Sequence, residues 1–119
     1  MSEITSNNTE EVRTLNSNST TSVTAILGTS VDLFLPSTLA NCILNLEFFS
    51  SNPSFVVAGN MTVQGQYQNG RKQNIATLDL SIVNSYLVIG KFTKLIITLN
   101  ALTGADTVVV SADQNSNIL

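Results

Sequence analysis

Residues 61–71 read Met-Thr-Val-Gln-Gly-Gln-Tyr-Gln-Asn-Gly-Arg, and this stretch decides the fold class. Apolar or small side chains alternate with polar ones from Met61 to Tyr67, which is the period of a strand with one buried face. Asn69-Gly70 then favours a type I′ hairpin turn, because both residue types tolerate a positive φ. The stretch therefore predicts a strand, a tight turn and a return strand in an antiparallel sheet.

The same alternation continues in both directions along the chain. Strand patterns occur around residues 22–27, 31–35, 44–48, 55–57, 78–82, 87–89, 95–101 and 108–112. Turns rich in Gly, Pro and Asn separate them at a spacing of roughly 8–12 residues, and no long stretch has the helical period. About eight short strands of this kind predict an all-β protein, an antiparallel β-sandwich of jelly-roll type with a core of Leu, Ile and Val.

Residues 1–21 differ in composition from the rest of the chain. Ile4, Val12 and Leu15 are isolated apolar residues among Ser, Thr, Asn and acidic residues. Such a stretch buries too little apolar area to offset its ordering entropy. We therefore predict an extended or disordered N-terminal arm over 1–21 and a β-sandwich domain over 22–119. The arm is either a free tail or a segment that orders on a partner through those three side chains.

The composition excludes several classes of site. The chain has no His, no Trp and one Cys, so a His-dependent triad, a disulfide within the chain and a multi-Cys zinc site are all absent. A net charge of −3 argues against a nucleic-acid surface. No apolar run reaches the roughly 20 residues of a membrane span, and the N-terminus lacks the pattern of a secretory signal. We expect no cofactor, no metal, no nucleic acid and no membrane partner, and assembly in the cytoplasm.

Candidate catalytic groups are few. Asp32, Glu47 and Asp79 fall at polar positions of different predicted strands. Two carboxylates across a cleft can cleave a glycosidic bond, but strand alternation places such residues on the solvent face. No nucleophile motif or phosphate-binding loop accompanies them. Cys42 is expected to be a small buried hydrophobe. We therefore expect that the protein is not an enzyme.

One polar row leaves a binding alternative open. Thr62, Gln64, Gln66 and Gln68 form the polar side of the strand that begins at Met61, beside Tyr67. Together they have the donors and acceptors to hold a glycan, although the chain offers no Trp as a stacking platform. The same row is equally consistent with a solvated face that carries no charge.

Several apolar residues fall on the face opposite the predicted core: Phe34, Phe49, Val88, Ile96 and Val109. Charged residues are only 11% of the chain, against about 25% in ordinary soluble domains, so few charges protect the sheet edges. Either the assumed register is wrong in places, or the face is covered by a partner. We predict an oligomer or partner interface at Phe34, Phe49, Val88 and Ile96, in a homo-oligomer that we expect to be a trimer.

Residues 61–71, followed by 90–110, resemble a β-sandwich module of tailed-bacteriophage virion proteins. In that module a Thr-Val strand leads into a hairpin, and a later pair of strands closes the sheet. The resemblance covers residues 42–112. It implies a virion structural protein, above all a capsid decoration protein that binds the major capsid protein or another virion protein and stabilises the head. A tail or fibre-base adaptor and a glycan-binding attachment module are the alternatives. The resemblance carries over no catalytic residue.

Overall fold

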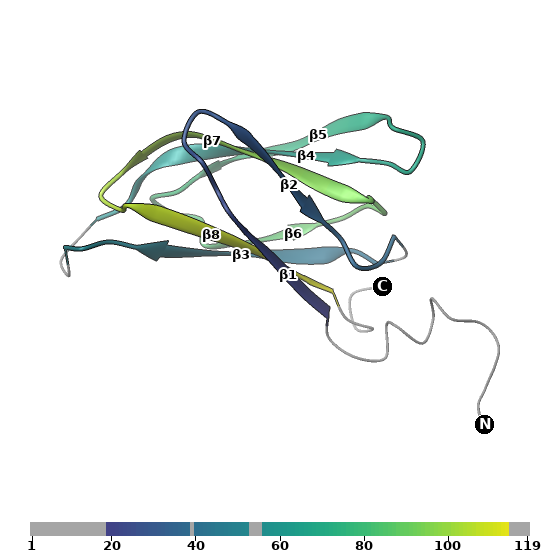
Figure 1. The fold of residues 1–119 in the computed structure, drawn as a ribbon, viewed down its shortest axis with the longest axis horizontal. Helices are drawn as coiled ribbons and strands as arrows, with labels where there is room; N and C mark the ends of the chain where they lie inside the picture. The colour runs from purple at the N-terminus through teal and green to yellow at the C-terminus, as the bar shows by residue number, and fades with distance from the viewer. Residues whose placement is uncertain (1–18, 39, 53–55, 115–119) are drawn as a thin grey trace, which may run out of the picture.

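The computed structural model describes residues 19–38, 40–52 and 56–114. These residues form eight strands and no helix: β1 (Ser19–Thr24), β2 (Ser30–Phe34), β3 (Cys42–Phe49), β4 (Ala58–Gln66), β5 (Lys72–Asp79), β6 (Ser85–Val88), β7 (Lys94–Thr103) and β8 (Thr107–Gln114). The strands make two four-stranded sheets, in the orders β1-β8-β3-β6 and β2-β7-β4-β5. Figure 1 shows the two sheets as facing layers. The predicted all-β antiparallel sandwich is confirmed.

The strand order is that of a jelly roll. Strand β1 pairs with β8, β2 with β7, β3 with β6 and β4 with β5, all antiparallel. The chain is thus one long antiparallel ribbon that turns back at the β4–β5 hairpin and is wound into two sheets. The pairings β3–β8 and β4–β7 complete the sheets. As a result, the connections β1–β2, β3–β4, β5–β6 and β7–β8 lie at one end of the sandwich, and the other three lie at the opposite end (Figure 1).

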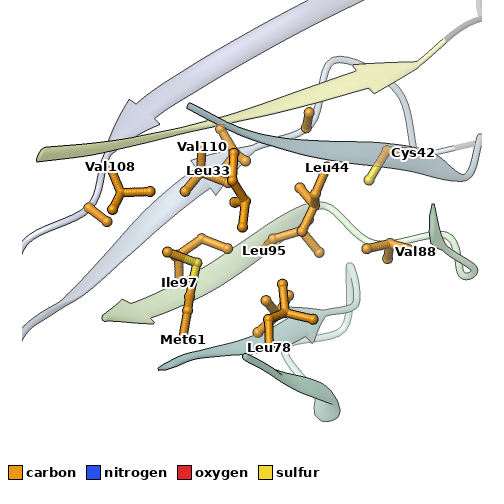
Figure 2. Close-up of a cluster of buried hydrophobic side chains, with 14 of the residues drawn as sticks. Leu33, Cys42, Leu44, Met61, Leu78, Val88, Leu95, Ile97, Val108 and Val110 are labelled. Atoms are coloured by element: carbon orange, nitrogen blue, oxygen red, sulfur yellow. The ribbon is translucent and has the colours of Figure 1, made fainter. Parts of the chain in front are cut away.

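The core consists of the inner faces of both sheets. Figure 2 shows the labelled side chains directed into the space between the layers: Leu33, Cys42, Leu44, Met61, Leu78, Val88, Leu95, Ile97, Val108 and Val110. Every one of them is buried. On β3, β4 and β8 they alternate with less buried residues, most of which are polar, as the period-two pattern predicts.

Val88 corrects the register predicted for the strand near residue 87. The pattern left Val88 outside and placed Leu87 and Ile89 inside, but Val88 is 0% exposed and the other two are exposed. Val88 pairs with the buried Cys42 in antiparallel register, and directly paired residues point to the same face. The prediction that Val88 belongs to an outer interface is therefore wrong.

Phe92 is a core residue that the sequence pattern did not predict. It lies in the β6–β7 connection, is fully buried, and packs against Tyr67 with ring centroids 4.7 Å apart. A Cβ atom built on Gly65 or on Gly90 would lie 2.5 Å from the Phe92 ring. The two glycines thus leave the space that the ring occupies, which closes one end of the core.

Gln114 anchors the connection between β2 and β3. Its side chain is fully buried. The Oε1 atom accepts a hydrogen bond from the Ser37 amide (3.0 Å), and Nε2 donates to the carbonyl oxygens of Ser37 (2.8 Å) and Ala40 (3.1 Å). Buried polar groups of this kind need hydrogen-bond partners. One side chain at the end of β8 therefore holds two points of a loop that is about 75 residues away in sequence.

The β4–β5 hairpin forms where the sequence predicts it, but with a different turn. The Gly70 amide donates to the Tyr67 carbonyl, which makes Gln68 and Asn69 the central pair, and Gly70 has a φ of 91°. A turn of this length followed by a glycine at positive φ is the common three-residue hairpin loop. The two-residue type I′ turn with Asn69-Gly70 at its centre is therefore not formed.

The remaining boundaries shift by a few residues. Strand β1 begins at Ser19, so the residues 19–21 that were assigned to the arm are in the sheet. The predicted arm anchors Ile4, Val12 and Leu15 lie outside the described residues. Strand β5 ends at Asp79. Of the strand predicted at 55–57, residues 56 and 57 are not in a strand, and residue 55 lies outside the described residues.

Candidate functional site

The three carboxylates considered for catalysis do not meet. Asp32 accepts a hydrogen bond from Lys94 Nζ at 3.0 Å on the outer face of one sheet. Asp79 Oδ1 accepts from the hydroxyl (2.7 Å) and the amide (3.0 Å) of Ser81, and these bonds lower the pKa of Asp79. Glu47 is exposed on the other sheet. Across the described residues, no three His, Cys, Asp or Glu side chains gather as metal ligands would.

Cys42 is a buried thiol in β3. It is free and almost fully buried, and this burial, with a smaller effect of the Asp113 charge, raises the pKa of the thiol to about 12. At pH 8 the group is therefore neutral, and the reactive thiolate is almost absent.

We expect a thiol reagent such as DTNB to label the native protein at pH 8 far more slowly than the urea-unfolded chain, because the native thiol is both protonated and inaccessible. The measurement is the absorbance of released thiolate with and without urea. Equal rates in the two states would show that Cys42 is accessible in the native fold.

The structure separates the four residues predicted as an interface. Phe34 is 64% exposed and Phe49 is also exposed, whereas Val88 belongs to the core. Ile96 lies on the outer face of β7, as alternation predicts, but it is only 8% exposed between its strand neighbours Asp32 and Gln64. An interface at the two phenylalanines stays a prediction, whereas Ile96 is covered within its own chain.

Exposed hydrophobic side chains gather at one end of the sandwich. The described residues include eight exposed large hydrophobics, and five of them lie on connections or strand ends at the end that holds the β7–β8 turn. We call these five the apolar end: Ile26, Leu27, Phe49, Val56 and Ile82. Val56 (82%) and Ile82 (79%) are the most exposed of them. The pattern assigned Ile82 to the core, but β5 ends before it and the chain turns at residues 80–82.

Backbone contacts fix the loops of the apolar end. The Asp106 amide donates to the Phe49 carbonyl (2.8 Å), and Asp106 Oδ2 accepts from the Ser51 amide (3.0 Å). A Cβ built on Gly104 would lie 1.8 Å from the Val56 carbonyl oxygen, so the β3–β4 connection lies directly on the β7–β8 turn. Exposed hydrophobic side chains of the apolar end therefore lie on loops that are held in place by the sandwich. Binding residues often lie on loops positioned by a rigid scaffold in this way.

The opposite end is basic and hollowed. All four basic residues that the structure describes lie there, on the β4–β5 hairpin, the β6–β7 connection and the first residues of β5 and β7. We call them the basic end: Arg71, Lys72, Lys91 and Lys94. Lys94 pairs with Asp32, whereas the other three make no ion pair with the described residues.

An open hollow of about 420 Å³ lies at the basic end. Its lining residues come from three connections: Thr38, Tyr67, Gln68, Asn69, Arg71 and Lys91. The Arg71 guanidinium lies 4.5 Å from the centre of the Tyr67 ring, and the Tyr67 hydroxyl donates to Gln73 Oε1 at 2.5 Å. The hollow therefore presents two cations, amide donors and one ring edge, a set that binds carboxylates or backbone carbonyls.

The polar row proposed for glycan binding is engaged within the sheet. Gln64 Nε2 donates to Asn74 Oδ1 (2.7 Å), and Gln66 Nε2 donates to the Gly70 carbonyl (3.1 Å). Thr62 accepts from Asn100 (2.9 Å). Tyr67 and Gln68 instead line the hollow at the basic end. The structure therefore does not unite Gln64, Gln66 and Tyr67 in one site.

Across the described ranges, the chain has no helix with the length and apolar character to cross a membrane. No family model and no curated protein matches the chain. A solved structure described as "Bacillus endospore appendages form a novel family of disulfide-linked pili" is similar, with 13% sequence identity over 83% of this chain and 85% of that chain and a TM-score of 0.43. This likeness is too distant to carry an argument about function.

Proposed function

We propose that the protein is a non-catalytic structural subunit that joins a larger, multi-copy assembly through its apolar end. One observation carries the proposal. In a chain with few charges, five exposed large hydrophobic side chains gather on anchored loops at one end. Exposed hydrophobic side chains that are concentrated in one region, rather than scattered singly, often mark an interaction site. One of the five, Phe49, is of a residue type that is enriched in the cores of protein interfaces.

The specific form that we propose is a capsid decoration protein of a phage head, which would bind the major capsid protein or another virion protein and be located in the virion. Its support is the resemblance of residues 61–71 and 90–110 to virion modules. Jelly rolls occur in capsid and lectin domains alike, so the fold is compatible with this form without selecting it. Small contacts repeated over a symmetric shell would add up through high effective concentration, and binding to the assembled shell alone would stabilise it.

A tail or fibre-base adaptor would use the same apolar end at low copy number. A glycan-binding attachment module is the second candidate. For this function we propose the hollow at the basic end, rather than the polar face of the sheet, as the binding site. A glycan there would contact Tyr67, Arg71 and Lys91, and the two cations would select a sugar that carries a carboxylate.

The double substitution Val56→Ser and Ile82→Ser tests the proposal. Both side chains are almost fully exposed, so the fold should keep its stability within about 0.5 kcal/mol. Burying two such side chains in an interface is worth roughly 3 kcal/mol or more, so each contact should weaken by at least about 100-fold. The measurement is co-sedimentation of the tagged chain with purified phage heads, and with the high-mass fractions of the cells that make it.

The matched control is Leu87→Ser, which removes an exposed hydrophobic outside the apolar end. We expect the wild type and this control to sediment with particles and the double variant to stay in the monomer fractions. If all three stay in the monomer fractions, the proposed function is wrong. If all three sediment equally, the apolar end is not the contact.

A further inference from the structure

The two ends of the sandwich carry opposite charge. At the apolar end, Asp79 closes β5 and Asp106 occupies the β7–β8 turn, and Glu47 lies two residues before the end of β3. No basic residue of the described ranges lies there, because all four are at the basic end. At the basic end, Asp32 neutralises Lys94 and Asp113 is the other carboxylate nearby. The part of the chain that the structure describes is therefore polarised along its strands, acidic and apolar at one end and basic at the other.

The basic end also offers polar and apolar groups that could contact the apolar end. The hollow is open, and amide side chains of Gln68 and Asn69 line it together with Arg71 and Lys91. Exposed Phe34 and Ile89 lie at the same end, where β2 finishes and β6 leads into its connection. The basic end therefore offers hydrogen-bond donors to the β7–β8 turn and to the carboxylates of the apolar end. It also offers apolar contact area to the exposed hydrophobic side chains of the apolar end.

We propose that the surface which receives the apolar end is the basic end of a second copy of this chain, so that copies associate head to tail. The proposal rests on the proposed function and names its first partner. Val56 and Ile82 pack against the basic end of the next copy, where Phe34 and Ile89 are exposed, and Asp79 and Asp106 face Arg71, Lys72 and Lys91 of that copy. Because the two surfaces differ, the contact is heterologous, and it repeats until a ring closes or a filament grows.

Charge decides between this arrangement and the symmetric ones. Two apolar ends face to face would bring Asp79, Asp106 and Glu47 against their own copies, and two basic ends would do the same with three cations that pair with no carboxylate among the described residues. Like charges across an interface are costly, whereas complementary ones orient the encounter. The head-to-tail contact is the arrangement in which both surfaces meet opposite charge.

A pair of variants with altered charge tests the proposal. The first carries Val56→Lys and Ile82→Lys, which replaces two exposed hydrophobic side chains of the apolar end with cations, and the second carries Arg71→Glu and Lys91→Glu, which makes the hollow anionic. All four positions are exposed, so circular dichroism should show both variants folded. The measurement is sedimentation velocity of the full chain over a concentration series, with Leu87→Lys as the control for a charge placed on an exposed hydrophobic elsewhere.

We expect concentration-dependent association of the wild type, weakened by salt. Each variant alone should need at least about tenfold more protein to associate, and the control should not. An equimolar mixture of the two variants should return to within about threefold of the wild type, because each end then meets opposite charge on its neighbour. A mixture no better than the separate variants would overturn the proposal.

Two further outcomes separate this inference from the proposed function. A wild type that stays monomeric at every concentration, yet sediments with particles, refutes head-to-tail contact and leaves the proposed function standing. A chain that neither self-associates nor sediments with particles refutes both. Loss of self-association on deletion of residues 2–18, with both ends unchanged, would assign the contact to the N-terminal segment and would also overturn the proposal.

Discussion

Replacing Phe92 by alanine will lower the free energy of unfolding by about 3–5 kcal/mol, the range for deleting a fully buried ring that cannot be refilled. The ring is enclosed by Gly65, Gly90 and Tyr67, and its removal leaves a cavity where the hairpin meets the core. Domains of this kind are stable by only about 5–15 kcal/mol in total, so the variant should be close to unfolding. Urea unfolding followed by circular dichroism measures the change.

A second substitution shows whether the packing around Phe92 explains the effect. Gly65→Ala sets a methyl group 2.5 Å from two atoms of the Phe92 ring, so it should itself destabilise the wild type. In the Phe92→Ala background the ring is absent, and the same methyl group should cost much less or fill part of the cavity. The double-mutant cycle should therefore give a clear coupling energy. Phe49→Ala, at an exposed ring, is the control and should change stability by less than about 1 kcal/mol. Additive effects at positions 65 and 92 would contradict the packing described.

Replacing Gln114 by leucine should destabilise the fold by about 2–4 kcal/mol, although leucine is the more apolar residue. The change removes three hydrogen bonds that hold Ser37 and Ala40, each worth about 0.5–1.5 kcal/mol net, in a buried place where water cannot replace them. Urea unfolding gives the magnitude, and amide hydrogen exchange should be faster for the Ser37 amide. Gln68→Leu, at an exposed position, is the matched control. Equal stability of the two variants would mean that the anchor contributes nothing.

The sheet architecture could be predicted because most strands bury only one face. On β4, Met61 and Val63 are buried while Thr62 and Gln64 are not. Such alternation in the sequence shows directly which face of the strand is buried. Strand β6 has no such contrast, since apolar residues occupy both of its faces. There the choice of Val88 over Leu87 depends on pairing with β3, which is about 45 residues away and leaves no local trace in the sequence.

The candidate surfaces were harder to predict, because they are assembled from connections. Ile82 and Leu27 continue strand-like patterns, so the sequence predicts that they belong to strands and to the core. Only the strand ends show that they lie on turns and point outward. Phe92, likewise, stands outside every alternating run, and its burial depends on two glycines from different parts of the chain.

The charge asymmetry could have been found from the sequence once the topology was assumed. In a jelly roll, the odd-to-even connections share one end, so Asp106 and Asp79 belong to one end and Arg71 and Lys91 to the other. The signal is the position of each charge relative to the strand order. Net charge alone, which is small, does not contain it.

Hydroxyl-radical footprinting of the assembled and the isolated protein tests the central claim most directly, because it reports the exposure of individual side chains in the native particle. If the protein works through its apolar end, then Leu27, Phe49, Val56 and Ile82 should be protected in the assembly, whereas Leu87 should react equally in both forms. Equal reactivity of those four side chains in the two forms would contradict the account.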